Sequence, residues 1–230
     1  MDTLIQIDKE LLLWLNSFHT PFWDVIMMIF TRKEFWIPFY MILLYQIYKF
    51  RGKEALLWII GLFVLIALCD QISTQLFKHV FERFRPSHDP SLQGIINLVG
   101  NYRGGKYGFV SSHATNSFGF AIFSSLLFKN KLYTFFIFIW SLLIIYSRIY
   151  LGVHFPGDVL GGILLGLLIG YGVYRLTKWG ISKYKLSNIK VGQKLKNIDY
   201  RSVWWIIGVA SAEVLTICLV VRKLLKYGLF

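Results

Sequence analysis

The chain has 230 residues, of which 56% are hydrophobic and 16% are charged, and its formal net charge is +13. Soluble domains are about 45–50% apolar and about 25% charged, so this composition excludes an ordinary soluble domain and favours a membrane protein. The basic residues gather in short segments between apolar stretches, which is typical of a membrane topology signal and argues against a nucleic-acid partner.

The first 18 residues carry apolar side chains at helical spacing, namely Leu4, Ile7, Leu11, Trp14, Leu15 and Phe18. This segment has no basic beginning, and Asp8, Lys9 and Glu10 interrupt its apolar run, so it is not a signal peptide. The pattern predicts an N-terminal amphipathic helix that lies at the membrane interface. The next stretch, PFWDVIMMIF, predicts a second interfacial helix.

Six later stretches are candidates to cross a membrane, which takes about 20 apolar residues. They are residues 35–48, 55–77, 113–128, 132–150, 159–176 and 203–221. The first is short unless Glu34 and Lys49 lie at the interface, and the third is short because it begins with polar residues. No proline- or serine-rich linker and no repeat divides the chain, so residues 1–230 are predicted to form one all-α membrane domain, a six-transmembrane helix bundle.

The positions of the basic residues predict the orientation of this bundle. Eight of them fall in residues 175–201, and smaller clusters occupy residues 49–53 and 129–131. Loops rich in Lys and Arg remain in the cytoplasm, so these segments are expected there. The N-terminus, the long connection over residues 78–112 and the segment SRIYLGVHFPGD (residues 147–158) are then expected on the outer face.

Candidate functional side chains gather on that outer face. They are Lys78, Arg85, Ser111, Ser112, His113, Arg148, His154 and Asp158. Lysine and arginine suit phosphate oxygens, and a serine pair just before a helix favours an anion. Of two histidines, one can attack phosphorus while the other protonates the leaving oxygen. Asp158, four residues after His154, can orient the imidazole.

Other interpretations apply to single residues. A lone cation at the end of a span usually extends to the interface, which is the prediction for Arg83 and Lys106. His19 and His88 are interpreted as structural, although His88 lies close to the basic cluster in sequence. A zinc site is an alternative for the two site histidines and Asp158, but the three cations would repel a metal.

Two features inside the apolar stretches remain. Gly162, Gly166 and Gly170 recur every four residues and predict a close-packed helix face. Glu213, in the middle of the last stretch, is an intramembrane carboxylate, a residue type that is usually functional. The sequence assigns it no role.

The order and spacing of the polar residues resemble three signature motifs of the type 2 phosphatidic acid phosphatase superfamily. The motifs are Lys78-x6-Arg85-Pro86, then Ser111-Ser112-His113, then Ser147-Arg148-x5-His154-x3-Asp158. The resemblance covers about residues 16–176, with a motif core at about 55–176 and an additional C-terminal span at 203–221. The second motif departs from the family pattern Pro-Ser-Gly-His, because this chain has Val110-Ser111-Ser112-His113.

The resemblance implies a metal-independent enzyme without a cofactor that removes phosphate from a lipid in the bacterial inner membrane. Its implied roles are a phosphohistidine-forming nucleophile, His154, supported by Asp158; a general acid, His113; and phosphate-binding groups at Lys78, Arg85, Arg148 and the backbone around Ser111 and Ser112. Undecaprenyl diphosphate, lipid A and phosphatidylglycerol phosphate are the implied substrates. The expected partners are this lipid and the bilayer, and the sequence indicates no oligomeric state. Vanadate-dependent haloperoxidation and a lipid-phosphate-binding or transport protein remain open as alternatives.

Overall fold

The computed structural model describes residues 2–188 and 197–228. Within these residues the chain is helical and has no β-strand, which confirms the all-α class. Four helical runs are long and apolar enough to cross a membrane: Lys33–Phe81, Lys131–Tyr150, Pro156–Lys183 and Tyr200–Lys226. The first run is divided by a turn at Gly52–Glu54.

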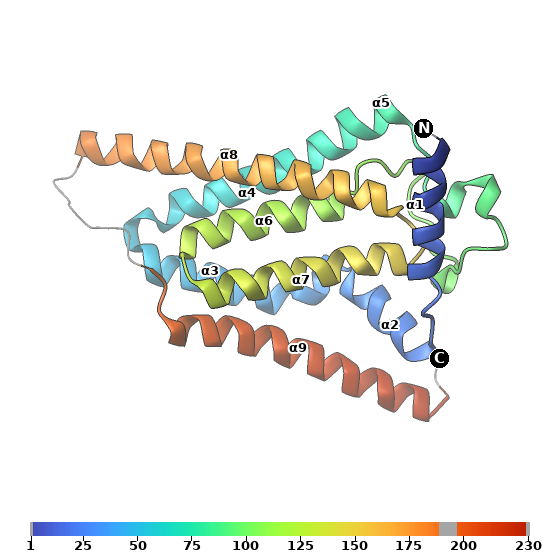
Figure 1. Cartoon of the computed structure of the whole chain (residues 1–230). Helices are drawn as coiled ribbons and strands as arrows, with labels where there is room; N and C mark the ends of the chain where they lie inside the picture. The colour runs from blue at the N-terminus through green and yellow to red at the C-terminus, as the bar shows by residue number, and fades with distance from the viewer. Residues whose placement is uncertain (1, 189–196, 229–230) are drawn as a thin grey trace.

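In chain order the longer helices are α1 (Asp2–Leu15), α2 (Pro21–Phe30), α3 (Ile37–Arg51), α4 (Ala55–Gln71), α6 (Ser112–Phe128), α7 (Lys131–Tyr150), α8 (Pro156–Asn188) and α9 (Tyr200–Lys226). A π-helical segment, η3 (Ile72–Lys78), and the short α5 (His79–Phe81) continue α4. The 3₁₀ helices are η1 (Lys33–Trp36), η2 (Gly52–Glu54), η4 (Pro86–His88), η5 (Pro90–Leu92) and η6 (Val99–Asn101). Figure 1 shows the long helices side by side, with α1 lying across one end of the bundle.

The contact between α6 and α8 lies at the centre of the bundle and depends on glycine. A Cβ atom at Gly162 would lie 2.6 Å from the carbonyl oxygen of Ser111, and one at Gly170 would lie 2.5 Å from that of Gly119. Only glycine permits such close approach of two helix backbones. The predicted close-packed glycine face is confirmed, and it holds the start of α6 against the start of α8.

The stretch expected to form a second interfacial helix, α2, packs instead against α7 and α9. Its side chains Ile26, Met27 and Phe30 are buried. The chain then breaks at η1, where the Trp36 indole donates a hydrogen bond to the Phe30 carbonyl oxygen at 2.9 Å. Thus α2 is part of the bundle wall, and a break separates it from α3.

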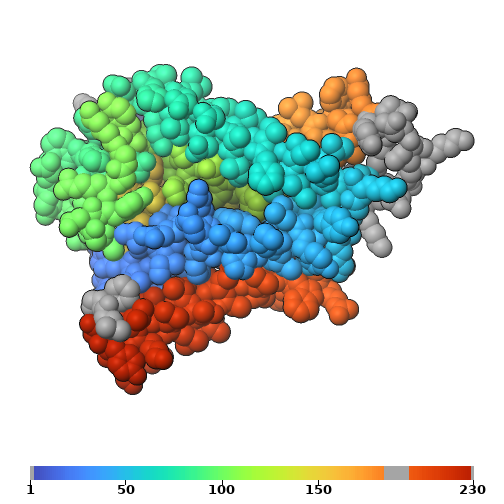
Figure 2. Space-filling view, turned by 180° about the vertical axis from the view of Figure 1, so that it is seen from behind, coloured from blue at the N-terminus to red at the C-terminus, as the bar shows by residue number. Residues whose placement is uncertain are grey.

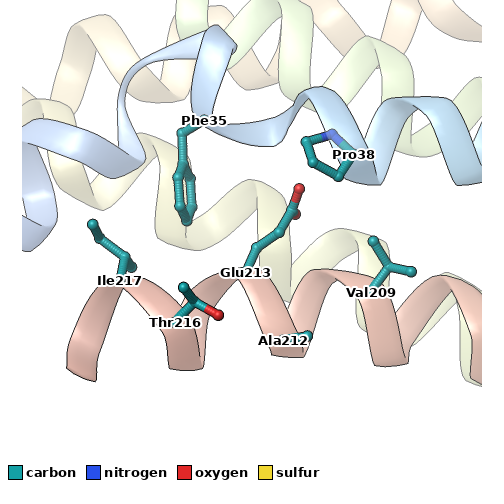
Figure 3. A pocket seen from close by; sticks show the side chains of 7 residues that line it. All are labelled: Phe35, Pro38, Val209, Ala212, Glu213, Thr216 and Ile217. Carbon is teal, nitrogen blue, oxygen red and sulfur yellow. The ribbon is translucent and has the colours of Figure 1, made fainter. Parts of the chain in front are cut away.

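Glu213 supplies a hydrogen-bond acceptor to the start of α3, just after this break. A helix start leaves backbone N–H groups without partners, and the residue before α3, Trp36, makes no side-chain cap. The Phe39 N–H donates to Glu213 Oε1 at 3.0 Å. Figure 3 shows the carboxylate reaching from α9 toward Pro38, in an apolar groove. An unsatisfied N–H costs several kcal/mol in hydrocarbon, so Glu213 stabilises the start of α3 from a neighbouring helix.

Replacing Glu213 with alanine is expected to destabilise the protein because the Phe39 N–H loses its acceptor. The free energy of unfolding is expected to fall by about 1–2 kcal/mol. Each kcal/mol lost lowers Tm by about 2–4 °C in a chain of this size. Thermal unfolding of the detergent-solubilised protein measures it. Glu213→Gln keeps an amide oxygen as acceptor and should retain most of the stability. Equal Tm values for Glu213→Ala and the unaltered chain would refute the capping role.

The N-terminal helix α1 presents polar residues to the protein and apolar residues outward. On its inner side Leu12 is fully buried, and the Asn16 amide, just beyond the helix, donates to the Tyr150 carbonyl oxygen at 2.7 Å. On its outer side Leu4, Ile7, Leu11, Trp14 and Phe18 are exposed. Five of the six residues of the predicted apolar stripe are therefore exposed, whereas Leu15 packs against the core of the bundle.

Candidate active site

The segments that carry the predicted site residues meet at the end of the bundle beside α1 (Figure 1). Lys78 ends η3, and Ser112 begins α6. Arg148 lies in the last turn of α7, and Asp158 lies in the first turn of α8. The structure therefore brings these residues, together with Arg85, His113 and His154 from adjoining positions, to one end of the bundle.

His154 and Asp158 form a buried pair at the start of α8. Their side chains are 1% and 0% exposed. Asp158 Oδ2 accepts the Phe155 N–H at 3.1 Å, so the carboxylate reaches back to the residue before the helix, as in a capping box. The same oxygen lies 3.4 Å from His154 Nδ1, at the outer limit of a hydrogen bond. The carboxylate thus faces Nδ1, and Nε2 is the imidazole nitrogen left for chemistry.

The charge around His154 is positive. Arg148 donates to the Thr31 hydroxyl and, at 3.3 Å, to the Tyr102 hydroxyl. Arg85 Nε donates to the Tyr107 carbonyl oxygen at 3.0 Å. Burial and the neighbouring Arg148 guanidinium lower the pKa of Arg85 to about 10.

These cations have no carboxylate counter-ion among the described residues. In residues 2–188 and 197–228, no carboxylate forms an ion pair with Lys78, Arg85 or Arg148. Burying unpaired cations costs free energy, so the cluster is suited to an anion that supplies the missing charge. No group of three or more His, Cys, Asp or Glu side chains in the described ranges is arranged to hold a metal ion.

Burial and the positive charges of Arg85 and Arg148 hold the pKa of His154 well below its usual range. The imidazole is therefore neutral at neutral pH and keeps a lone pair on one nitrogen. A neutral imidazole is the form that can act as a nucleophile.

The hydroxyl groups of the second motif serve the protein itself. Ser111 Oγ accepts the Ala114 N–H at 3.4 Å and so caps α6, while the Ser111 N–H donates to the Asp158 carbonyl oxygen at 3.0 Å. Ser112 Oγ accepts from Lys78 Nζ at 2.8 Å and from Ser73 Oγ at 2.9 Å. The backbone N–H groups in the first turn of α6 are therefore what this motif offers to an anion.

Two neighbours of the site were missed by the sequence analysis. The His113 side chain hydrogen-bonds to the backbone of Thr31, whose hydroxyl also meets Arg148. Tyr102 supplies a second hydroxyl to Arg148. Thr31 lies at the end of α2 and Tyr102 lies in the long connection, and no spacing rule distinguishes them from other polar residues.

The prediction for Arg83 was wrong. Its guanidinium does not extend to the interface but forms ion pairs with Asp158 at 2.8 Å and Asp8 at 2.7 Å. The backbone explains why, since Gly108 N–H donates to the Arg83 carbonyl oxygen and Arg85 N–H donates to that of Lys106. In such an extended pair, residues two apart face the same side, so Arg83 and Arg85 both face the site. The alternation Arg83-Phe84-Arg85 in the sequence could have indicated that both arginines lie on the same side.

The remaining candidates make other contacts. His19 lies 2.7 Å from Asp24 and stacks near Tyr150. His88 lies 3.5 Å from the Gly104 carbonyl oxygen. Lys106 lies over the rings of Phe84 and Tyr107, at 5.4 and 5.3 Å.

The surface is hollowed on the side opposite to the view of Figure 1. Figure 2 shows a depression between the blue segment that contains α2 and α3 and the cyan and teal segment that contains α4 and α5. The yellow-green of α6 is visible on its floor.

Known proteins resemble this chain in sequence and fold. A sequence model of the PAP2 superfamily matches residues 55–182. A lipid A 4'-phosphatase of Porphyromonas gingivalis is 40% identical over 187 residues, which are 80% of this chain and 78% of that protein. A lipid A 4'-phosphatase of Bacteroides thetaiotaomicron is 38% identical over 76% of this chain and 78% of that protein.

A solved structure, the transmembrane PAP2-type phosphatidylglycerolphosphate phosphatase from Bacillus subtilis, has the same fold. Its TM-score is 0.60 at 23% identity, and the match covers 84% of this chain and 90% of that one. These findings confirm the family that the three motifs predicted. The chain therefore belongs to the PAP2 superfamily and is a membrane lipid phosphatase of the PAP2 type.

Proposed function

We propose that this protein hydrolyses a phosphate monoester of a lipid A-type glycolipid at the outer face of a bacterial inner membrane. The observation that carries the proposal is the set of three cations around a neutral His154, which has no carboxylate partner in the described ranges: Lys78 is partly buried, and Arg85 and Arg148 are buried. The choice of lipid A rests on the two relatives, which bear that activity in their names and match most of the chain.

The proposed topology has six spans. Helix α2 with α3, then α4, α6, α7, α8 and α9 run along the bundle in turn, each opposite to the one before (Figure 1). The basic residues at 49–53, 129–131 and 175–183 lie at the end away from the site, which we assign to the cytoplasm. Lys190, Lys194 and Lys196 of the same basic run lie outside the described residues.

Helix α1 is proposed to lie in the outer interface. Its exposed apolar side chains are placed where lipid would cover them, while its polar side chains bind the bundle.

The first chemical step is attack of His154 Nε2 on phosphorus. The P–N bond forms while the bond from phosphorus to the lipid oxygen breaks. The bound phosphate anion favours the charged imidazolium form of His113, which gives its proton to that oxygen, so the lipid leaves as an alcohol. Asp158 stabilises the positive charge that develops on the imidazole, and the three cations and the α6 backbone bind the phosphoryl oxygens.

The second step returns the enzyme to its starting state. His113, now neutral, takes a proton from water, and the water oxygen attacks phosphorus. The P–N bond breaks, inorganic phosphate leaves, and His154 is neutral again. Every proton moves between His113, the lipid oxygen and water, so the protein residues suffice for the proposed reaction.

A phosphate-release assay tests the proposal. Purified protein in detergent is given lipid A, an isoprenoid diphosphate and phosphatidylglycerol phosphate, each with and without a chelator. We expect release from lipid A that the chelator does not reduce. Release from a different lipid alone would overturn the substrate assignment, and inhibition by the chelator would overturn the metal-free chemistry. If phosphate is bound but never released, the protein binds or transports lipid phosphates.

A further inference from the structure

We propose that Arg83 is a positioning residue that fixes the catalytic carboxylate Asp158, and that Asp8 of the N-terminal helix holds Arg83 in place. The inference rests on the proposed function, because it concerns the same His154–Asp158 pair. It assigns a role in turnover to two residues that the three signature motifs do not specify. Arg83 occupies a variable position of the first motif, and Asp8 lies 75 positions before it.

The Arg83 guanidinium bridges two carboxylates. Nη1 donates to Asp158 Oδ1 at 2.8 Å, and Nη2 donates to Asp8 Oδ2 at 2.7 Å. The face of the guanidinium lies over the Phe155 ring, with Cζ 4.2 Å from the ring centre. A planar fork with both ends paired and one face covered has a defined orientation. Carboxylates accept from both Nη groups, so the guanidinium is directed at Asp158 and Asp8.

Arg83 also fixes the rotation of the Asp158 carboxylate. Oδ2 faces the Phe155 N–H and His154 Nδ1, whereas Oδ1 contacts Arg83. Asp158 is fully buried, and no other described side chain donates to Oδ1. Without Arg83 the buried oxygen loses its donor, and the carboxylate loses the contact that keeps Oδ2 directed at His154.

Asp8 completes the chain of contacts. Its Oδ1 accepts the Gly157 N–H at 2.7 Å, so the same carboxylate binds both Arg83 and the first turn of α8. A Cβ atom at Gly157 would lie 2.8 Å from Asp8 Oδ2, so a larger residue there would displace the carboxylate. Lys9 anchors α1 next to it, with Nζ 2.7 Å from the Ser91 hydroxyl.

The contacts therefore link α1 to the catalytic pair. The helix exposes its apolar side and directs Asp8 inward, onto Arg83 and α8. A purely structural ion pair would change stability alone. A positioning role changes the rate of the chemical step and leaves substrate binding nearly unchanged, because the phosphate-binding cations are untouched.

Steady-state kinetics on lipid A measure the difference. Arg83→Gln should lower kcat about 10- to 100-fold, as loss of an orienting partner does elsewhere, and should change KM less than about threefold. Arg83→Lys should retain more of kcat than Arg83→Gln, because the ammonium keeps the positive charge. Its kcat should stay below that of the unaltered protein, because an ammonium cannot bridge both carboxylates. Asp8→Asn should lower kcat less than Arg83→Gln, since Arg83 keeps its contact with Asp158.

Matched controls separate this role from a general effect of lost charge. Arg175→Gln removes an arginine whose Nη1 donates to Tyr171, and Glu10→Gln removes an acid that accepts from Gln6 on the exposed side of α1. Both should keep the kcat of the unaltered protein. In an Asp158→Asn background, Arg83→Gln should cause no further loss of kcat, because its partner is already changed.

The outcomes distinguish this inference from the proposed function. Unchanged kcat in Arg83→Gln, or an equal further loss in the Asp158→Asn background, would overturn the positioning role while the phosphatase stands. If Arg83→Gln does not fold, Arg83→Lys and Asp8→Asn decide, and full kcat in both would overturn it. No phosphate release from the unaltered protein would instead overturn the proposed function and, with it, this inference.

Discussion

Replacing His154 with alanine is expected to abolish turnover and to lower kcat by a factor of about 10⁴ or more. The imidazole is buried, neutral and aligned by Asp158, and the described part of the site offers no second nucleophile placed against that carboxylate. The cations remain in the variant, so the affinity for a lipid phosphate should persist. Phosphate release and equilibrium binding to the same lipid measure the two effects.

His88→Ala serves as the control, because His88 contacts only a backbone oxygen at 3.5 Å among the contacts of the described chain. It should retain the full rate. Full activity in His154→Ala would show that another group attacks phosphorus, and the role assignment would then be wrong.

Replacing His113 with alanine is expected to have an effect that depends on the leaving group. A lipid alkoxide needs a proton as it departs, so kcat on a lipid phosphate should fall about 10²- to 10⁴-fold. Nitrophenolate, the leaving group of nitrophenyl phosphate, departs without that proton, so the first step on this substrate should slow far less. Rates of alcohol or phenol release on the two substrate types measure the difference.

An equal loss on both substrates would contradict the assignment of His113 as general acid. It would point to a positioning role instead, which its hydrogen bond to the Thr31 backbone could support.

The parts of the fold that sequence predicts are those that depend on local patterns. Apolar length predicted the helices, and the glycine spacing predicted the α6–α8 contact. That the candidate site residues meet could be predicted because each lies beside or within an end of a helix, and helix ends on one side of a bundle meet. The family resemblance then indicated a role for each residue.

The features that were missed depend on contacts between distant segments. Glu213 caps a helix start that is 174 residues away, and Asp8 meets Arg83 75 residues away. Neither contact leaves a spacing pattern in the sequence. The helix α2 resembled an interfacial helix because it is short and apolar, but its burial comes from α7 and α9, which follow much later in the chain.

The structure shows what Ser112 does at the position where this chain departs from the family motif. Where the family usually has glycine, the Ser112 hydroxyl accepts from Lys78 and joins it to Ser73. The ammonium is thus held at the start of α6, beside the backbone that is proposed to bind phosphate.

The central claim is that phosphate passes through a covalent bond to His154. Rapid quenching of the unaltered protein during turnover of a lipid phosphate, followed by mass spectrometry, measures that bond directly. We expect an acid-labile, base-stable phosphate on His154, formed at least as fast as kcat and absent from His154→Ala. Rapid phosphate release with no covalent phosphate, or with phosphate on a different residue, would contradict the account.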